Sequence, residues 1–289
     1  MNKRGIRVPT SLIGNNLVKS KRSQLTIFLI IAVVLVGVVI IFFVLKQTKP
    51  PIEDEPQIIG SIDVTAIINK VNLCLKDSAK YSVSYIGFQG GYYNLPEKNT
   101  IIFTERYPIF MDKGQNIIPS IDLIQSEISN FTEIQLIDCF DDFKEFKEQG
   151  FDINQGKAAV KTKINQDNVA INLTFPLTIT KGDSSVAISK FSTVIRPAKL
   201  PKILNFTNQV AAQHQQDPRG ICLACISSLA EQNSLDVTVL ETFESDVFLF
   251  RVIDSESNFT DYPYNFYFAS RYDFPNCNNT RGCLDELSN

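Results

Sequence analysis

The sequence of 289 residues predicts an α+β protein: an N-terminal transmembrane helix followed by an extracytoplasmic domain with an antiparallel sheet and packed helices. Three observations lead to this prediction. Residues 25–45 form an almost unbroken apolar run. Beyond it, the spacing of apolar residues alternates between helical and two-residue periods. All six cysteines follow the run, as expected for a domain in an oxidising compartment.

The apolar run predicts a membrane anchor. Residues 25–45 contain 18 Leu, Ile, Val or Phe residues among 21. As a helix they would extend about 31 Å, close to the roughly 30 Å hydrocarbon core of a bilayer. A cleaved secretory signal has an apolar region of about 7 to 15 residues and a small-residue cleavage site. This run is longer and leads directly into "KQTKPP", so we expect an uncleaved signal anchor.

The charges around the run predict its orientation. Basic residues without any acidic residue precede it, namely Lys3, Arg4, Arg7, Lys19, Lys21 and Arg22. Positively charged flanks stay in the cytoplasm, so residues 1–24 are expected to be a cytoplasmic tail in a single-pass protein of the cell membrane. Residues 46–289 hold 22 of the 28 basic and all 31 acidic residues, a formal charge of −9. This charge argues against nucleic-acid binding and leaves the bilayer and other membrane or surface proteins as expected partners.

Two helices are expected at the start of the domain. Residues 46–60 are proline-rich and predict a stalk, and residues 61–289 predict the folded domain. Ser61 is the expected N-cap of the first helix, whose apolar stripe consists of Val64, Ile67, Ile68, Val71, Cys74, Leu75 and Ala79. Gly90 and Gly91 then predict a turn. Ser120 is the expected N-cap of a second helix that ends at Gly150.

Each of these helices carries one cysteine on its apolar face. The stripe of the second helix consists of Ile121, Ile124, Ile128, Phe131, Cys139, Phe140 and Phe143. We therefore expect a disulfide between Cys74 and Cys139. Two buried free thiols are the alternative.

The rest of the domain predicts strands, two helices and further strands. From residue 157 the apolar period is two, and the turns "NQDN" and "KGD" indicate an antiparallel meander of at least three strands. Helices are expected over residues 197–216 and 220–233, and strands over 235–243, 246–254 and 264–272. We expect one sheet assembled from both groups of strands, with helices on one face.

The remaining cysteines and the single histidine are the candidates for chemistry. Cys222 and Cys225 form a C-x-x-C pair at the start of a predicted helix, which is compatible with redox chemistry, with a metal site completed by Cys277 and Cys283, or with structural disulfides. A local disulfide between Cys277 and Cys283 is favoured. His214 is expected on a solvated helix face. We therefore assign no catalytic residue, metal or cofactor, and a protein without enzymatic activity is favoured.

Glycosylation sequons agree with a surface-exposed domain, and the pattern occurs at Asn130, Asn172, Asn205, Asn258 and Asn278. Asn172 is expected to point outward from its strand.

Residues 23–28, "SQLTIF", resemble the class III signal of archaeal type IV pilin-like proteins, in which a basic run and a small residue precede Gln-x-Ser-x-Glu and a hydrophobic stem. The resemblance implies cleavage between Ser23 and Gln24. The sequence departs from the pattern at Ser23, where the family has glycine, and at Phe28, where it has glutamate. The acid serves filament assembly in that family. The resemblance thus implies a pilin-like filament subunit as one alternative function.

Over nearly the whole chain, "QLTIF", "FQGGYYNLP", "LIDCFDDF" and "VAINLTFPLTI" resemble an uncharacterised family of single-span archaeal surface proteins. This resemblance implies no known activity. It supports Cys74, Cys139 and the Gly90–Gly91 turn as parts of the architecture. The expected function is a structural or binding role at the cell surface, with the filament subunit and a thiol–disulfide enzyme using Cys222 and Cys225 as alternatives.

Overall fold

The computed structural model describes residues 34–36, 57–59 and 62–274, and the chain divides into a unit Met1–Glu53 and a unit Asp54–Asn289. In the first unit, residues 34–36 are helical. The rest of the predicted membrane span, residues 25–45, lies outside the described residues. Among the helices that are described, none has both the length and the apolar character needed to cross a bilayer.

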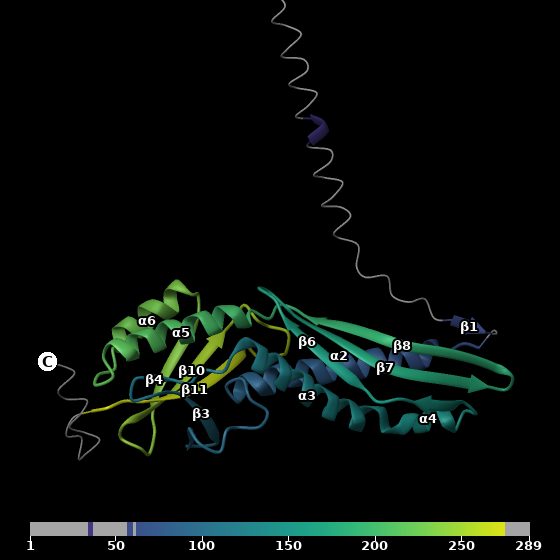
Figure 1. Cartoon of the computed structure of the whole chain (residues 1–289), viewed down its shortest axis with the longest axis horizontal. Helices are drawn as coiled ribbons and strands as arrows, with labels where there is room; N and C mark the ends of the chain where they lie inside the picture. The colour runs from purple at the N-terminus through teal and green to yellow at the C-terminus, as the bar shows by residue number, and fades with distance from the viewer. Residues whose placement is uncertain (1–33, 37–56, 60–61, 275–289) are drawn as a thin grey trace, which may run out of the picture. The chain divides into compact units, whose positions relative to one another are not determined.

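The second unit is α+β, as predicted, and its described residues form two sheets (Figure 1). The first sheet has the order β1-β8-β7-β5, and β6 pairs with another part of β7. Its strands, all antiparallel, are β1 Gln57–Ile59, β5 Asp152–Gln155, β6 Ala159–Ile164, β7 Val169–Lys181 and β8 Ser184–Ile195. The predicted meander is therefore present. Strand β1 lies within the segment that was expected to be a stalk.

The second sheet contains parallel and antiparallel strands. Its strand order is β2-β3-β11-β10-β9, and β4 pairs with β3. Its strands are β2 Thr100–Ile102, β3 Arg106–Asp112, β4 Gln115–Asn116, β9 Asp236–Glu241, β10 Val247–Asp254 and β11 Tyr264–Arg271. Strands β3 and β11 are parallel, and the other pairs are antiparallel. The expectation of a single sheet is thus wrong, because the late strands pair with β3, in a region to which the sequence assigned no strand.

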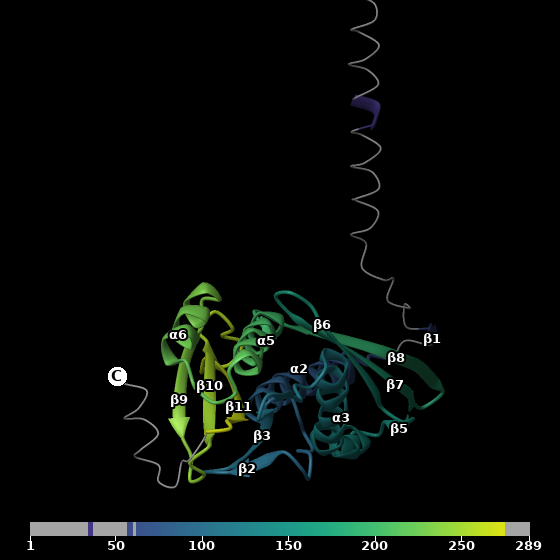
Figure 2. The same ribbon diagram turned by 60° about the vertical axis from the view of Figure 1, so that its left-hand side comes forward.

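One long helix connects these sheets. Helix α2, Thr65–Phe88, packs against α3, Ile121–Phe140, and contacts both β8 of the first sheet and β11 of the second (Figures 1 and 2). Helix α2 begins four residues after Ser61, which lies outside the described residues. The Asp63 side chain instead accepts a hydrogen bond from the Thr65 backbone N–H, 2.9 Å away, and this bond lowers the pKa of Asp63.

Helix α3 ends earlier than predicted. Its Ser120 N-cap accepts from the Leu123 N–H as expected, but three residues with positive φ, Asp141, Asp142 and Phe143, break the helix. They form the short helix η1, Asp141–Phe143, and α4, Lys144–Lys147, follows. The break lets Phe143 turn inward, where its ring is buried and lies 5.4 Å from Phe140. Phe143 is therefore buried, as its place in the apolar stripe predicted, but it lies on a break and not on a continuous helix.

The last two helices agree with the predicted ones. Helix α5, Leu200–Gln216, packs against α6, Leu223–Gln232, and these helices contact β3 and β9 of the second sheet, respectively. The short turn between α5 and α6 brings the end of one helix to the start of the other. The C-x-x-C pair lies at this junction.

Candidate functional site

The cysteines form two disulfides among the described residues. Cys74 of α2 is joined to Cys139 of α3, the pair that the sequence favoured. Cys74 is buried in the apolar stripe of α2, so this bond has a structural role. Cys277 and Cys283 lie outside the described residues, as do Ser23, Gln24 and Asn278.

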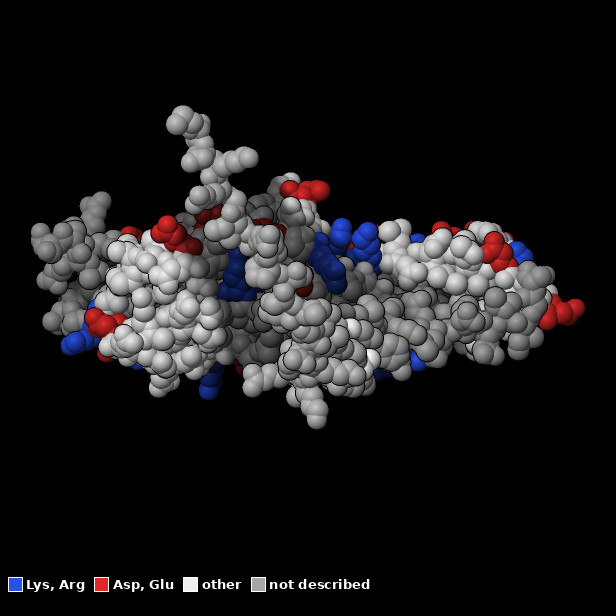
Figure 3. Space-filling model, turned by 90° about the horizontal axis from the view of Figure 1, so that it is seen from above, with Lys and Arg blue, Asp and Glu red and all other residues white. Residues whose placement is uncertain are grey.

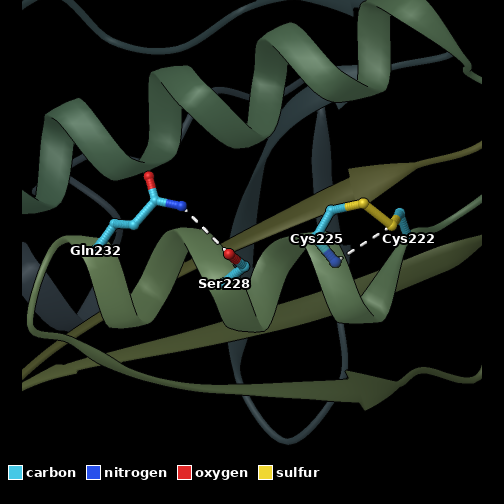
Figure 4. The surroundings of a disulfide bond; sticks show 4 residues. All are labelled: Cys222, Cys225, Ser228 and Gln232. Carbon is cyan, nitrogen blue, oxygen red and sulfur yellow. Dashed lines mark hydrogen bonds between the residues drawn. A yellow bond between two sulfur atoms is a disulfide. The ribbon is translucent and has the colours of Figure 1, made fainter.

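The second disulfide, between Cys222 and Cys225, is called the α6 disulfide here. Cys222 is the N-cap of α6, and its Sγ accepts a hydrogen bond from the Cys225 backbone N–H, 3.2 Å away (Figure 4). The Cys222 side chain is exposed and Cys225 is half-buried. Helix α5 precedes this junction, so the strand that leads into thioredoxin-type C-x-x-C sites is replaced by a helix.

The expectation of a solvated His214 is wrong, because the imidazole is only 2% exposed. It stacks on Tyr272, with ring centroids 4.2 Å apart. Burial lowers the pKa of His214 to about 4, although the charge of Asp112 acts in the opposite direction. Neither Nδ1 nor Nε2 has a hydrogen-bond partner among the described residues. His214 is therefore a neutral, unpartnered imidazole in the interior.

His214 and Cys222 line the same cavity, which we call the His214 pocket. It has a volume of about 270 Å³ and lies between the end of α5, the start of α6 and the residue after β11. Its other lining residues are Val210, Gln213, Asp217, Gly220, Ile221, Ile226 and Tyr272. The structure thus brings together the two features that the sequence singled out separately, the only histidine and the C-x-x-C pair.

A larger hollow, the aromatic groove, lies between α2 and the loop that leads into β11. Its volume is about 640 Å³, and its aromatic walls are Tyr81, Tyr85 and Phe88 from α2 and Tyr262 and Tyr264 from the other side. Tyr262 is 77% exposed and Tyr81 52%. Such exposed rings around a hollow are typical of binding sites.

Packing behind the groove holds its aromatic wall in place. The ring of Phe131 in α3 lies 5.6 Å from Tyr81 and 4.8 Å from Tyr85. Gly87 faces the Tyr264 ring, and a Cβ at this position would overlap it. The close approach of α2 and β11 that forms the groove therefore requires a glycine at this position.

Two hydroxyl groups of groove residues, Ser84 Oγ and Tyr264 Oη, are buried without a hydrogen-bond partner in the described part of the chain. Burial raises the pKa of Tyr264, and burial together with Tyr81, Tyr93 and Glu105 raises that of Tyr85. Both phenols therefore keep their protons. They remain hydrogen-bond donors at any physiological pH.

Other predicted site residues lie on the surface. Asn130, Asn172, Asn205 and Asn258 are exposed. Acidic and basic side chains are interspersed on the face shown in Figure 3. Within residues 62–274, no cluster of His, Cys, Asp and Glu is arranged to hold a metal ion.

The sequence contained only part of the signal for these sites. The buried stripe of α5 includes Ile203, Thr207 and Val210, and the same helical spacing continues to His214. The burial of His214 could therefore have been predicted from this spacing. The aromatic groove had no such signal, because its two walls are about 180 residues apart in the chain. Comparisons with protein families, with curated proteins and with solved structures find no match to this chain.

Proposed function

We propose that the protein is a membrane-anchored surface protein with a cytoplasmic N-terminus, whose extracytoplasmic domain binds an extended, proline-containing peptide segment of another surface protein. Anchoring is supported by the apolar run of residues 25–45 and the basic residues before it. The aromatic groove is the observation that supports binding.

The spacing of the rings on α2 suits a polyproline II segment. Tyr81, Tyr85 and Phe88 lie on one face of the helix, and the first and last are seven residues apart, about 10 Å along the axis. A polyproline II helix rises about 3.1 Å per residue, so prolines three residues apart are separated by about 9 Å. Rings at this spacing contact successive prolines, as in other aromatic grooves that bind such segments.

The hydroxyl groups suit the backbone of the same ligand. A polyproline II helix has no internal hydrogen bonds, so its carbonyl oxygens accept from outside donors. Tyr81 and Tyr262 present exposed phenols at the groove, whereas the hydroxyls of Ser84 and Tyr264 are buried in its walls. Protonated phenols are the donors that such carbonyls require.

A saccharide fits this groove less well than a peptide. Each sugar ring has several hydroxyl groups, and each of these needs a partner when it is buried. The amide of Asn265, one of the few polar groups of the groove, already accepts from Arg251 and donates to the Pro263 carbonyl. Thr260 Oγ1 likewise donates to the Tyr262 carbonyl, so Asp77, Lys80 and Ser84 are the polar side chains that remain beside five aromatic ones.

Calorimetric titration tests the proposal. The full chain in lipid nanodiscs is titrated with a ten-residue peptide containing a Pro-x-x-Pro motif, and saturable binding is expected. Tyr81→Ala or Tyr262→Ala is expected to raise the Kd at least tenfold, because each removes an exposed wall of the groove. Phe243→Ala is the matched control, since Phe243 is also an exposed ring, at 83%, but lies outside the groove.

Two results contradict the proposal. One is equal binding by the wild type and both tyrosine variants, which would place the peptide elsewhere. The other is saturable binding of a soluble oligosaccharide with no binding of the peptide, which would change the ligand class.

A further inference from the structure

The α6 disulfide lies at the other end of β11 from the aromatic groove. Tyr264, the first residue of β11, lines the groove, and Tyr272, which follows its last residue, lines the His214 pocket. Eight residues of strand separate the two by about 26 Å. Peptide binding in the groove therefore does not account for the His214 pocket or the α6 disulfide.

The two sulfur atoms of this disulfide are not equivalent. Cys222 is exposed and its Sγ already accepts from the Cys225 N–H, 3.2 Å away, whereas Cys225 is half-buried. An incoming thiolate has access to Cys222. A thiolate formed at Cys222 is stabilised by the same N–H group and by the positive end of the α6 dipole. Stabilisation of the reduced form makes a disulfide a better oxidant.

His214 supplies a second, independent observation. A buried polar atom without a hydrogen-bond partner is destabilising, and this ring has two such atoms within the described residues. A neutral imidazole has one donor and one acceptor nitrogen, which complement the C=O and N–H groups of a peptide backbone. The pocket that the ring shares with Cys222, at about 270 Å³, is below the usual size of small-molecule sites.

We propose that the α6 disulfide accepts two electrons from a pair of cysteine thiols in a polypeptide substrate, whose backbone is held by His214. The first substrate thiol loses its proton and attacks Cys222 Sγ. The Cys222–Cys225 bond breaks, and Cys225 leaves as a thiolate that takes up a proton. The second substrate thiol, also deprotonated, attacks the substrate sulfur of the mixed disulfide and displaces Cys222 as a thiolate. The products are the substrate disulfide and reduced Cys222 and Cys225, so electrons and atoms balance in one turnover.

The surface of α6 gives the substrate room to bind. Leu223, next to Cys222, is 50% exposed. Ser228 and Gln232 follow on the helix, are exposed, and lie on one side of it with the disulfide, where Gln232 Nε2 donates to Ser228 Oγ (Figure 4). The polypeptide therefore has an apolar contact at Leu223 beside Cys222, and polar contacts at Ser228 and Gln232 on the side of the disulfide.

A single-turnover experiment tests the proposal. The oxidised full chain, purified without reductant in lipid nanodiscs, is mixed with a reduced, unstructured peptide that contains two cysteines. After an acid quench and alkylation, mass spectrometry counts the thiols. We expect one peptide disulfide for each Cys222–Cys225 pair reduced, and none with Cys222→Ser. The Cys277→Ser/Cys283→Ser double variant is expected to transfer at the wild-type rate.

The role of His214 has its own readout. The His214→Phe variant keeps a ring to stack on Tyr272 but loses both nitrogens. It is expected to oxidise the peptide at least tenfold more slowly, while dithiothreitol, which has no amide, reduces the α6 disulfide at an unchanged rate. Equal slowing of both reactions would show a merely structural role and overturn the assignment of His214.

The proposal fails if the peptide stays reduced, if Cys222→Ser still oxidises it, or if loss of Cys277 and Cys283 abolishes transfer. Peptide binding in the aromatic groove is unaffected by any of these results.

Discussion

The imidazole of His214 is held neutral by its surroundings. The ring is stacked on Tyr272 and has lost contact with water, which lowers its pKa from the usual 6.5 to about 4. Asp112 is the carboxylate that raises this pKa, and Asp217 lines the same pocket. Protonation in the folded state is thus opposed by burial more strongly than the Asp112 carboxylate favours it.

This pKa predicts a pH-dependent stability. Between pH 6.5 and 4 the unfolded chain protonates His214 and the folded chain does not, so the free energy of unfolding falls as the pH is lowered through this window. We expect the wild type to lose about 2 to 3 kcal/mol more than His214→Phe between pH 7 and 4, measured by urea unfolding. Equal losses of unfolding free energy by the two proteins between pH 7 and 4 would contradict the lowered pKa of His214.

A buried carboxylate ties β10 to α5. Asp254 is 0% exposed and accepts from Lys202 Nζ at 2.9 Å and from Ser257 Oγ at 2.6 Å. Its partners lie in α5 and in the turn after β10. The Asp254 side chain therefore fixes how helix and strand meet.

Removal of this carboxylate is expected to be costly. Asp254→Ala removes the buried acceptor of Lys202 and Ser257, whereas Lys202 Nζ keeps Glu256 Oε2 and the Ser234 carbonyl, each at 3.0 Å. We expect the free energy of unfolding to fall by about 1 to 3 kcal/mol in denaturant titrations. The control is Lys199→Ala, which removes the more exposed pair with Glu256 and should have a far smaller effect. Equal losses of unfolding free energy from the two substitutions would show that burial does not determine how much each ion pair stabilises the fold.

At the scale of elements, the Cys74–Cys139 disulfide joins α2 to α3 across 65 residues. Closing a loop of this length restricts the unfolded chain, and the chain-entropy estimate of the stabilisation is about 4 kcal/mol. We expect Cys74→Ala/Cys139→Ala to lower the free energy of unfolding by an amount of this order. Cys222→Ser/Cys225→Ser opens a loop with a separation of only three residues and should cost less. A larger loss of unfolding free energy in the Cys222→Ser/Cys225→Ser variant would contradict the dependence of the stabilisation on loop length.

Helices and strands with a long regular period were predictable, and short strands were not. The meander β6 to β8 and helices α2, α5 and α6 follow directly from their apolar spacing. Strand β3 is buried at five consecutive positions and contains Pro108, so it shows no alternation. Its partner β11 is about 160 residues away in the chain, and no local pattern encodes such a pairing. For this reason the sequence could not distinguish one sheet from two.

The candidate sites were predictable to the extent that they depend on one element. The helical spacing of Tyr81, Tyr85 and Phe88 is visible in the sequence, as is the C-x-x-C pair at the start of α6. What these residues face depends on β11, which contributes Tyr264 at one site and leads to Tyr272 at the other. The sites therefore follow from the fold, and the fold depends on contacts between distant segments.

For the whole molecule, the proposed function as a membrane-anchored protein requires an uncleaved chain. Intact-mass measurement of the membrane-extracted protein, with N-terminal sequencing, is expected to find residues 1–24 still attached. A mature chain that begins at Gln24 would instead support a pilin-like subunit, in which Phe28 occupies the position of the acid that assembly uses.

Photo-crosslinking tests the proposed binding role of residues 54–289. A Pro-x-x-Pro peptide carrying a benzophenone group is irradiated with the full chain in nanodiscs, and the adducts are mapped by mass spectrometry. We expect adducts on residues 77–88 of α2 and on residues 260–265, which form the two walls of the aromatic groove, and their loss in Tyr262→Ala. Adducts confined to α6 or to the first sheet, or none above the level of an alanine-substituted peptide, would contradict the claim.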